Sequence, residues 1–122
     1  MDTHYTISLV DGYVQVILEG NEDFEVASRL WPEVKAFCKE KDCFKVLGIA
    51  NTVSPLSVLD SYRHAELFRE LGITNQYTIA WVELNADAFK ATSFAETVLS
   101  NRGFPGRVFS DEKEAMNWLL NQ

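Results

Sequence analysis

Polar and apolar residues alternate at the start of the chain. Residues 5–10 place apolar side chains between polar ones, as a strand with one buried face does. A second run rich in Val and Ile occupies residues 13–18, and Asp11-Gly12 separates the two. An Asp-Gly pair between two such runs favours a tight turn, because that turn needs residues that tolerate positive φ. The pattern predicts an opening β-hairpin.

The spacing then changes to that of a helix. Between residues 23 and 41, apolar residues recur every three or four positions and fall on one helical face: Ala27, Leu30, Val34 and Phe37. Pro32 interrupts this segment, since it lacks an amide hydrogen and its ring clashes with the preceding turn. Either the helix begins near Trp31 with Pro32 in its first turn, or it is kinked there, and the sequence leaves both open.

Strand and helix patterns alternate from there to the end. Residues 44–50 are apolar on both faces except at Lys45, which predicts a central strand. Ser54-Pro55 predicts a helix start, with a side-chain cap followed by a preset φ, and Gly72 predicts its end. Residues 77–84 predict the second central strand.

The next helix is expected from about Ala86 to residues 101–103, and its buried stripe comprises Ala91, Phe94, Ala95, Val98 and Leu99. A short strand at 107–109 and a helix at 111–120 follow. This order predicts a single α/β domain over residues 1–122, with a mixed sheet opened by the hairpin and helices packed on it. A site is expected where strands end and helices begin.

Charge and composition exclude several classes of partner. The net charge of −7 argues against nucleic acid and against anionic membrane surfaces, which bind through Lys and Arg. No apolar run approaches the ~20 residues of a membrane span. The first residues lack a signal-peptide pattern, so we expect a cytoplasmic location. A zinc site needs four ligands, and besides Cys38 and Cys43 the sequence offers only His4 and His64 as further thiol or imidazole ligands. We therefore expect two reduced thiols and no metal. We also expect no cofactor.

The end of the chain carries a recognisable pattern, F-x-D-x-x-x-A-x-x-W-L, formed by Phe109, Asp111, Ala115, Trp118 and Leu119. With the order of elements, it resembles the SpoIIAA-like branch of the STAS superfamily, which includes anti-sigma-factor antagonists and relatives grouped with CRAL-TRIO lipid-binding domains. The resemblance implies a four- or five-stranded mixed sheet. For the antagonists it implies a phosphorylatable serine in an Asp-Ser motif after the central strand, and for the CRAL-TRIO-like relatives an apolar ligand cavity.

The segment after the central strand is the first candidate site. In place of the antagonist motif it reads Asn51-Thr52-Val53-Ser54-Pro55, without the aspartate or the glycine. Its position before a helix N-terminus suits an anion, so Asn51, Thr52 and Ser54 are candidates to bind a phosphate, and Thr52 or Ser54 to carry one. In the alternative interpretation Ser54 only caps the helix and Thr52 only forms a turn.

Two further groups are candidates. Asp60 and His64 share a helical face, where they could act as a proton-transfer pair, but Arg63 and Glu66 beside them favour a solvated face with weak ion pairs. Trp31, Leu56 and Tyr62 are candidates for an apolar pocket or a partner contact, and Trp31 in particular could close a cavity or face a partner.

The leading hypothesis from the sequence is a non-enzymatic regulatory module that binds another protein through residues 52–54 and the helix from Leu56 to Leu71. The alternative is a carrier or sensor that holds a small apolar ligand between sheet and helices. An enzyme is a distant third, resting on Asp60 and His64 alone. The oligomeric state stays open, with a dimer possible through the edge of the first strand.

Overall fold

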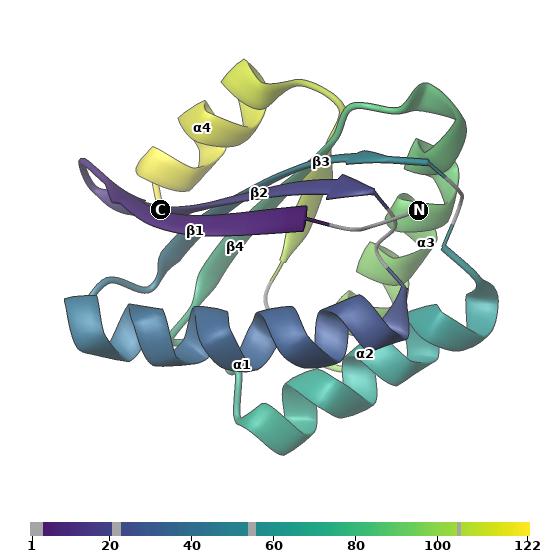
Figure 1. Ribbon diagram of the computed structural model, residues 1–122, viewed down its shortest axis with the longest axis horizontal. Helices are drawn as coiled ribbons and strands as arrows, with labels where there is room; N and C mark the ends of the chain where they lie inside the picture. Colours follow the sequence, from purple (N-terminus) through teal and green to yellow (C-terminus); the bar gives the residue numbers. More distant parts are fainter. Residues whose placement is uncertain (1–3, 21–22, 54–55, 105) are drawn as a thin grey trace.

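The computed structural model describes residues 4–20, 23–53, 56–104 and 106–122. Figure 1 shows a sheet with helices on both faces. In chain order the elements are β1 (His4–Val10), β2 (Tyr13–Gly20), α1 (Phe24–Lys41), β3 (Lys45–Thr52), α2 (Val58–Leu71), β4 (Thr78–Glu83), α3 (Ala86–Asn101), β5 (Arg107–Phe109) and α4 (Glu112–Leu120). The predicted α/β class is confirmed.

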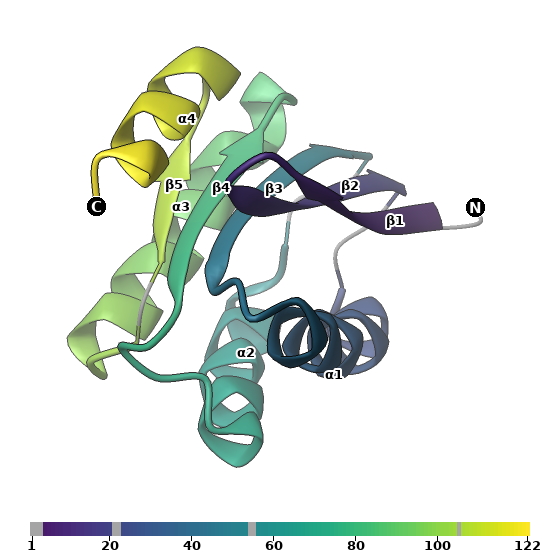
Figure 2. The same cartoon turned by 90° about the vertical axis from the view of Figure 1, so that its left-hand side faces the viewer.

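The five strands follow one another across the sheet in chain order, β1-β2-β3-β4-β5. β1 and β2 pair antiparallel, and every later neighbour pairs in parallel. Right-handed crossovers that all advance in the same direction place their helices on one face of a sheet. α1, α2 and α3 accordingly lie on one face, and α4, which follows the last strand, lies on the other (Figures 1 and 2).

Each face of the sheet has its own apolar core. The larger one joins β2, β3 and β4 to α1 and α2 and includes Val16, Leu30, Trp31, Phe68 and Trp81. The smaller one lies under α4 and includes Leu47, Val82, Ala115 and Leu119. Among the helices of the described segments, none has the length and hydropathy that crossing a membrane requires.

The opening hairpin forms as predicted. Val10 pairs with Tyr13, which leaves Asp11 and Gly12 as a two-residue turn. Gly12 has a φ of +94°, a conformation that glycine adopts without a steric penalty. The Asp-Gly signal therefore placed the turn correctly.

Helix α1 is a single helix that contains Pro32, so the option of a helix beginning near Trp31 is wrong. The Asp23 side chain caps its start by accepting from the Val26 amide at 2.9 Å. Ala27, Leu30 and Val34 are buried on the predicted face. Tertiary packing along this face outweighs the local cost of an internal proline.

Helix α2 begins later than the sequence predicted. Ser57 is its N-cap and accepts from the Asp60 amide at 3.1 Å, whereas the expected start, Ser54-Pro55, lies outside the described residues. Ser54 and Ser57 are both suitable cap residues by sequence. Only Ser57 is followed three residues later by an acidic side chain, Asp60, which lies in the first turn of the helix. Gly72 ends the helix with a φ of +71°, as predicted.

The end of β3 and the buried face of α3 also differ from expectation. β3 continues through Asn51 and Thr52, which were expected in a loop, because both pair with the end of β2. On α3 the buried face is formed by small residues, namely Ala88, Thr92, Ala95 and Val98. Phe94, predicted to be buried, is 39% exposed and contacts the ring of Tyr62 on α2.

Candidate ligand-binding cavity

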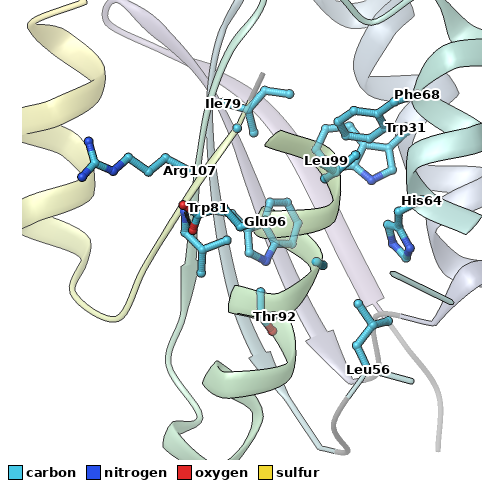
Figure 3. A pocket seen from close by; sticks show the side chains of 13 residues that line it. Trp31, Leu56, His64, Phe68, Ile79, Trp81, Thr92, Glu96, Leu99 and Arg107 are labelled. Atoms are coloured by element: carbon cyan, nitrogen blue, oxygen red, sulfur yellow. Dashed lines mark hydrogen bonds between the residues drawn. The ribbon is translucent and has the colours of Figure 1, made fainter. Parts of the chain in front are cut away.

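A small cavity lies between the sheet and helices α2 and α3. Its volume is about 50 Å³ and it is partly open to solvent. Figure 3 shows the side chains around it, which come from α1, α2, α3, β4 and β5. Most of the lining is apolar and comprises Trp31, Leu56, Phe68, Ile79, Trp81, Ala95, Leu99 and Val108, with Thr92, His64, Glu96 and Arg107 as the polar members.

Two indole rings form one wall of this cavity. Trp31 from α1 and Trp81 from β4 have their ring centroids 5.7 Å apart, and both side chains are almost fully buried. Neither Nε1 atom has a hydrogen-bond acceptor among the residues that the structure describes. A buried donor without an acceptor costs about 1–3 kcal/mol, so two of them beside one cavity are an unusual feature.

His64 also faces the cavity, which corrects the prediction that it lies on a solvated face (Figure 3). It is only 4% exposed. Its Nδ1 atom lies 2.6 Å from the carbonyl oxygen of Asp60, and because a carbonyl oxygen only accepts, Nδ1 carries the proton. Burial lowers the pKa of His64 below its ordinary value, although the contact with Asp60 and the charges of Asp60 and Asp23 oppose this effect. The imidazole is therefore neutral at pH 7.

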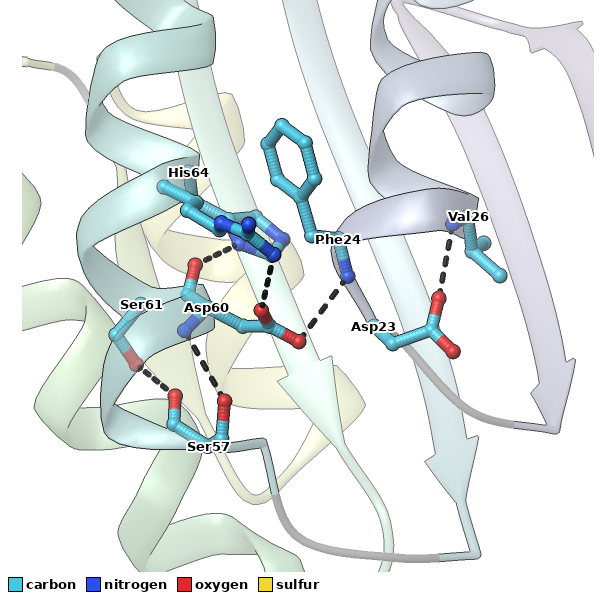
Figure 4. A network of polar contacts seen from close by, with 8 residues as sticks. Asp23, Phe24, Val26, Ser57, Asp60, Ser61 and His64 are labelled. Carbon is cyan, nitrogen blue, oxygen red and sulfur yellow. Dashed lines mark hydrogen bonds and ion pairs between the residues drawn. The ribbon is translucent and has the colours of Figure 1, made fainter.

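Asp60 joins helix α2 to helix α1 through its side chain (Figure 4). Its carboxylate accepts from the Phe24 amide at 3.3 Å and lies 3.6 Å from the guanidinium of Arg63. The Arg63 guanidinium in turn lies over the Phe24 ring. A carboxylate at a helix N-terminus is stabilised by the amides there, so this contact holds the two helices together at one end of the cavity.

The first candidate segment, 51–54, is divided by the structure. Thr52 is buried at the end of β3, and its hydroxyl donates to the carboxylate of Glu83 at 2.7 Å. The other Glu83 oxygen accepts from the amides of Thr52 and Asn85 at 3.1 and 3.0 Å. A phosphate on Thr52 would break this contact and place its charge beside Glu83. Asn51 is exposed on the opposite face of β3, and Ser54 lies outside the described residues.

The remaining candidates separate as well. Leu56 lines the cavity with Trp31, whereas Tyr62 is 43% exposed on the outer side of α2. Trp31 is buried and therefore faces the cavity and not a partner. Within the described ranges, no group of three or more His, Cys, Asp and Glu side chains is arranged to hold a metal ion.

Several lining residues were not singled out from the sequence. Phe68, Trp81 and Thr92 were not among the predicted site residues. A usable signal was present on α2, where Ser61, His64, Ala65 and Phe68 recur at helical spacing and are all buried. This stripe places His64 on the inner face of α2. The charged residues beside it in the sequence, Arg63 and Glu66, led instead to the prediction of a solvated face.

Comparisons with known proteins support the fold. No protein-family model and no curated protein sequence matches the chain. The structure is similar to that of an uncharacterized protein of the DUF3478 family with a SpoIIAA-like fold from Shewanella loihica PV-4. The TM-score is 0.55 and the sequences are 15% identical, over 96% of this chain and 93% of the other. The SpoIIAA-like fold predicted from the sequence is confirmed by this similarity.

Proposed function

We propose that the protein is a non-enzymatic binding module that holds a small, mainly apolar molecule between its sheet and helices α2 and α3. The observation that carries this proposal is the cavity beside Trp31 and Trp81, with its apolar lining and two buried indole donors. Pockets with an apolar wall and a few convergent polar groups are typical of small-molecule sites. The SpoIIAA-like fold is compatible with such a module.

The cavity volume limits the size of the ligand. An apolar cavity of about 150 Å³ accommodates benzene, and this one is about 50 Å³. A fatty-acid chain would exceed it, so the ligand we propose is a compact molecule of few atoms. This narrows the carrier hypothesis drawn from the sequence, in which lipids were one option.

Filling the cavity tests the proposal. Ala95 lines it and is 8% exposed, so Ala95→Val adds two methyl groups at its wall. Ala91→Val, on the same helix and half-buried outside the lining, is the matched control. Native mass spectrometry of protein purified gently from its own cells should detect a mass that leaves on denaturation in the wild type and in Ala91→Val but not in Ala95→Val. A bare chain in all three, or the same mass in all three, would contradict the proposal.

A second candidate function is favoured by a specific observation on the outer surface. Four apolar side chains of α2 and α3 are between 39% and 62% exposed and form what we call the α2–α3 patch: Val58, Leu59, Tyr62 and Phe94. Single exposed apolar residues are ordinary, but a contiguous group of them is typical of protein contacts. This patch supports the hypothesis of a module that binds another protein through α2.

Charge substitution in the patch tests this candidate. Leu59→Glu should abolish recovery of a specific partner without lowering the melting temperature, because Leu59 is 62% exposed. Leu9→Glu is the control, since Leu9 is 50% exposed on β1, away from the patch. If Leu59→Glu and Leu9→Glu reduce partner recovery equally, the α2–α3 patch is not the surface that binds the partner.

A further inference from the structure

The two edges of the sheet differ in whether their backbone groups are occupied. At the β5 edge, the Val108 amide donates to the carboxylate of Glu96 on α3 at 2.9 Å, and the strand has only three residues. At the other edge β1 has seven residues, and among the described residues no loop or side chain bonds to its backbone from outside the hairpin. Every second residue of an antiparallel strand directs its N–H and C=O groups away from its partner, so β1 presents a row of them at the open edge (Figure 2).

β1 also lacks the features that usually protect an edge strand. Natural proteins block such edges with charged side chains, prolines or bulges. β1 contains no Asp, Glu, Lys, Arg or Pro, and it pairs with β2 residue for residue, without a bulge, from His4 opposite Glu19 to Val10 opposite Tyr13. A regular, open edge of this kind is where an extended segment of another chain adds a strand to a sheet.

A groove lies beside this edge, between β1 and helix α1, which runs below β1 in Figure 1. Its lining combines apolar and acidic side chains and comprises Tyr5, Ile7, Glu33, Ala36, Phe37 and Glu40. Both glutamates are exposed, and Glu33 accepts from the Tyr5 hydroxyl. Of the lysines on α1, Lys35 donates to the carbonyl of Leu71, and Lys41 lies over the Phe37 ring at 5.7 Å from its centroid. The lining itself is therefore apolar and negatively charged.

We propose that the edge of β1 binds an extended segment of a partner protein that carries Lys or Arg at alternate positions. The segment continues the sheet, and its basic side chains lie in the groove, with their hydrocarbon stems against Ile7 and Phe37 and their charges near Glu33 and Glu40. A second copy of this chain matches less well. Antiparallel pairing of two β1 strands would bring the glutamates of both copies to one seam, and each copy has a net charge of −7. The site is distinct from the cavity and does not depend on the proposed ligand.

Synthetic peptides of the length of β1, titrated into ¹⁵N-labelled protein, test this proposal. The probe is acetyl-Arg-Thr-Arg-Thr-Arg-Thr-Arg-amide, which should shift the amide resonances of β1 saturably and slow the hydrogen exchange of its outward amides. Glu33→Gln/Glu40→Gln should weaken the binding about tenfold, because two solvent-screened charge contacts are lost. Glu112→Gln/Glu114→Gln, on α4 at the opposite face of the sheet, changes the net charge equally and should leave the dissociation constant unchanged.

Two N-methylated forms of the probe separate strand pairing from charge. One is methylated at the Arg amides and the other at the Thr amides, so only one of them keeps the N–H groups that face β1. That form should bind like the parent peptide, and the other should not bind. Equal binding of the two forms, equal dissociation constants in the two double variants, or no saturable shift in β1 would each overturn the proposal. Protein that sediments as a dimer with protected β1 amides would assign the edge to a second copy and would also overturn it.

Discussion

The indole ring of Trp81 lies directly over the Cα atom of Gly48 on the neighbouring strand. The two residues pair in register between β3 and β4, and both point towards the larger core. A Cβ atom added at Gly48 would lie 2.1 Å from Cε3 of Trp81 and 2.3 Å from Cζ3. Glycine is therefore required by the position of the ring, and this position forms one wall of the cavity.

Gly48→Ala is expected to displace Trp81. Overpacking of a core commonly costs about 1–3 kcal/mol, so the free energy of unfolding should fall by that amount in urea denaturation. The displacement should also weaken ligand binding. In a double-mutant cycle, the effect of Gly48→Ala should be much smaller in a Trp81→Leu background, because the clash is removed. An equal effect in both backgrounds would mean that the ring is not the cause.

The contact between Thr52 and Glu83 gives a second prediction. Thr52→Val removes the hydroxyl that donates to Glu83 at 2.7 Å and leaves a buried carboxylate oxygen with one donor fewer. Hydrogen bonds to charged groups contribute about 1.5–3 kcal/mol, so we expect a loss of that size in the free energy of unfolding. Thr52→Ser keeps the hydroxyl and should lose less. Equal stabilities of the two variants would argue that this contact does not hold β3 to β4.

His64 should make stability depend on pH. Burial lowers the pKa of His64 in the folded protein below 6.5, its ordinary value. Above that pH the ring is neutral in both states and contributes nothing. Below it the unfolded chain binds a proton that the folded protein does not, so the free energy of unfolding falls as the pH decreases, by up to about 1.4 kcal/mol per pH unit.

Urea denaturation between about pH 8 and 5 measures this dependence. His64→Gln should flatten the profile below pH 6.5. The readout is the slope, so a uniform loss of stability in His64→Gln does not obscure it. A slope unchanged in His64→Gln would assign the dependence to other groups.

The two cysteines should differ in reactivity. Cys38 is buried on α1, and burial, followed by the nearby Cys43, raises the pKa of its thiol to about 11. At pH 8 roughly one Cys38 thiol in a thousand is ionised, and the thiolate is the reactive form. A thiol-specific disulfide reagent should therefore modify the Cys38→Ser variant quickly, through Cys43. It should modify Cys43→Ser only on unfolding, and equal native rates would contradict the buried position of Cys38.

The sequence was sufficient for the order of elements because that order depends on local patterns. Asp11-Gly12 and Gly72 mark their turn and helix end through backbone geometry alone. Pro32 shows the opposite case, since its helix continues because the packed face of α1 outweighs the local penalty. Phe94 was wrongly predicted to be buried for a related reason. The buried face of α3 consists of small residues, and this choice of face depends on how α3 packs against α2, which the local sequence pattern does not contain.

The cavity was less accessible to prediction because residues from five elements form it. Trp31 and Leu56, two of the predicted pocket candidates, line the cavity, but their joint position with Trp81 depends on how α1 packs on β4. His64 was assigned to the surface because its neighbours in the sequence are charged. In helix α2 those neighbours, Arg63 and Glu66, are exposed, whereas His64 is buried. The Trp81 ring occupies the space above Gly48. Predicting this contact requires the register between β3 and β4, which pairs the two residues.

The agreement between strand order and chain order has a consequence for how the protein is made. Each strand from β2 onwards pairs with the strand immediately before it in the sequence, so no strand waits for a later one to be inserted between it and its predecessor. Synthesis proceeds from the N-terminus, and partial chains emerge in the same order. The sheet can therefore grow on the ribosome by one strand and one helix at a time. The face of β3 and β4 that packs against α4 is covered only once α4 has been made, because α4 follows all five strands in the chain.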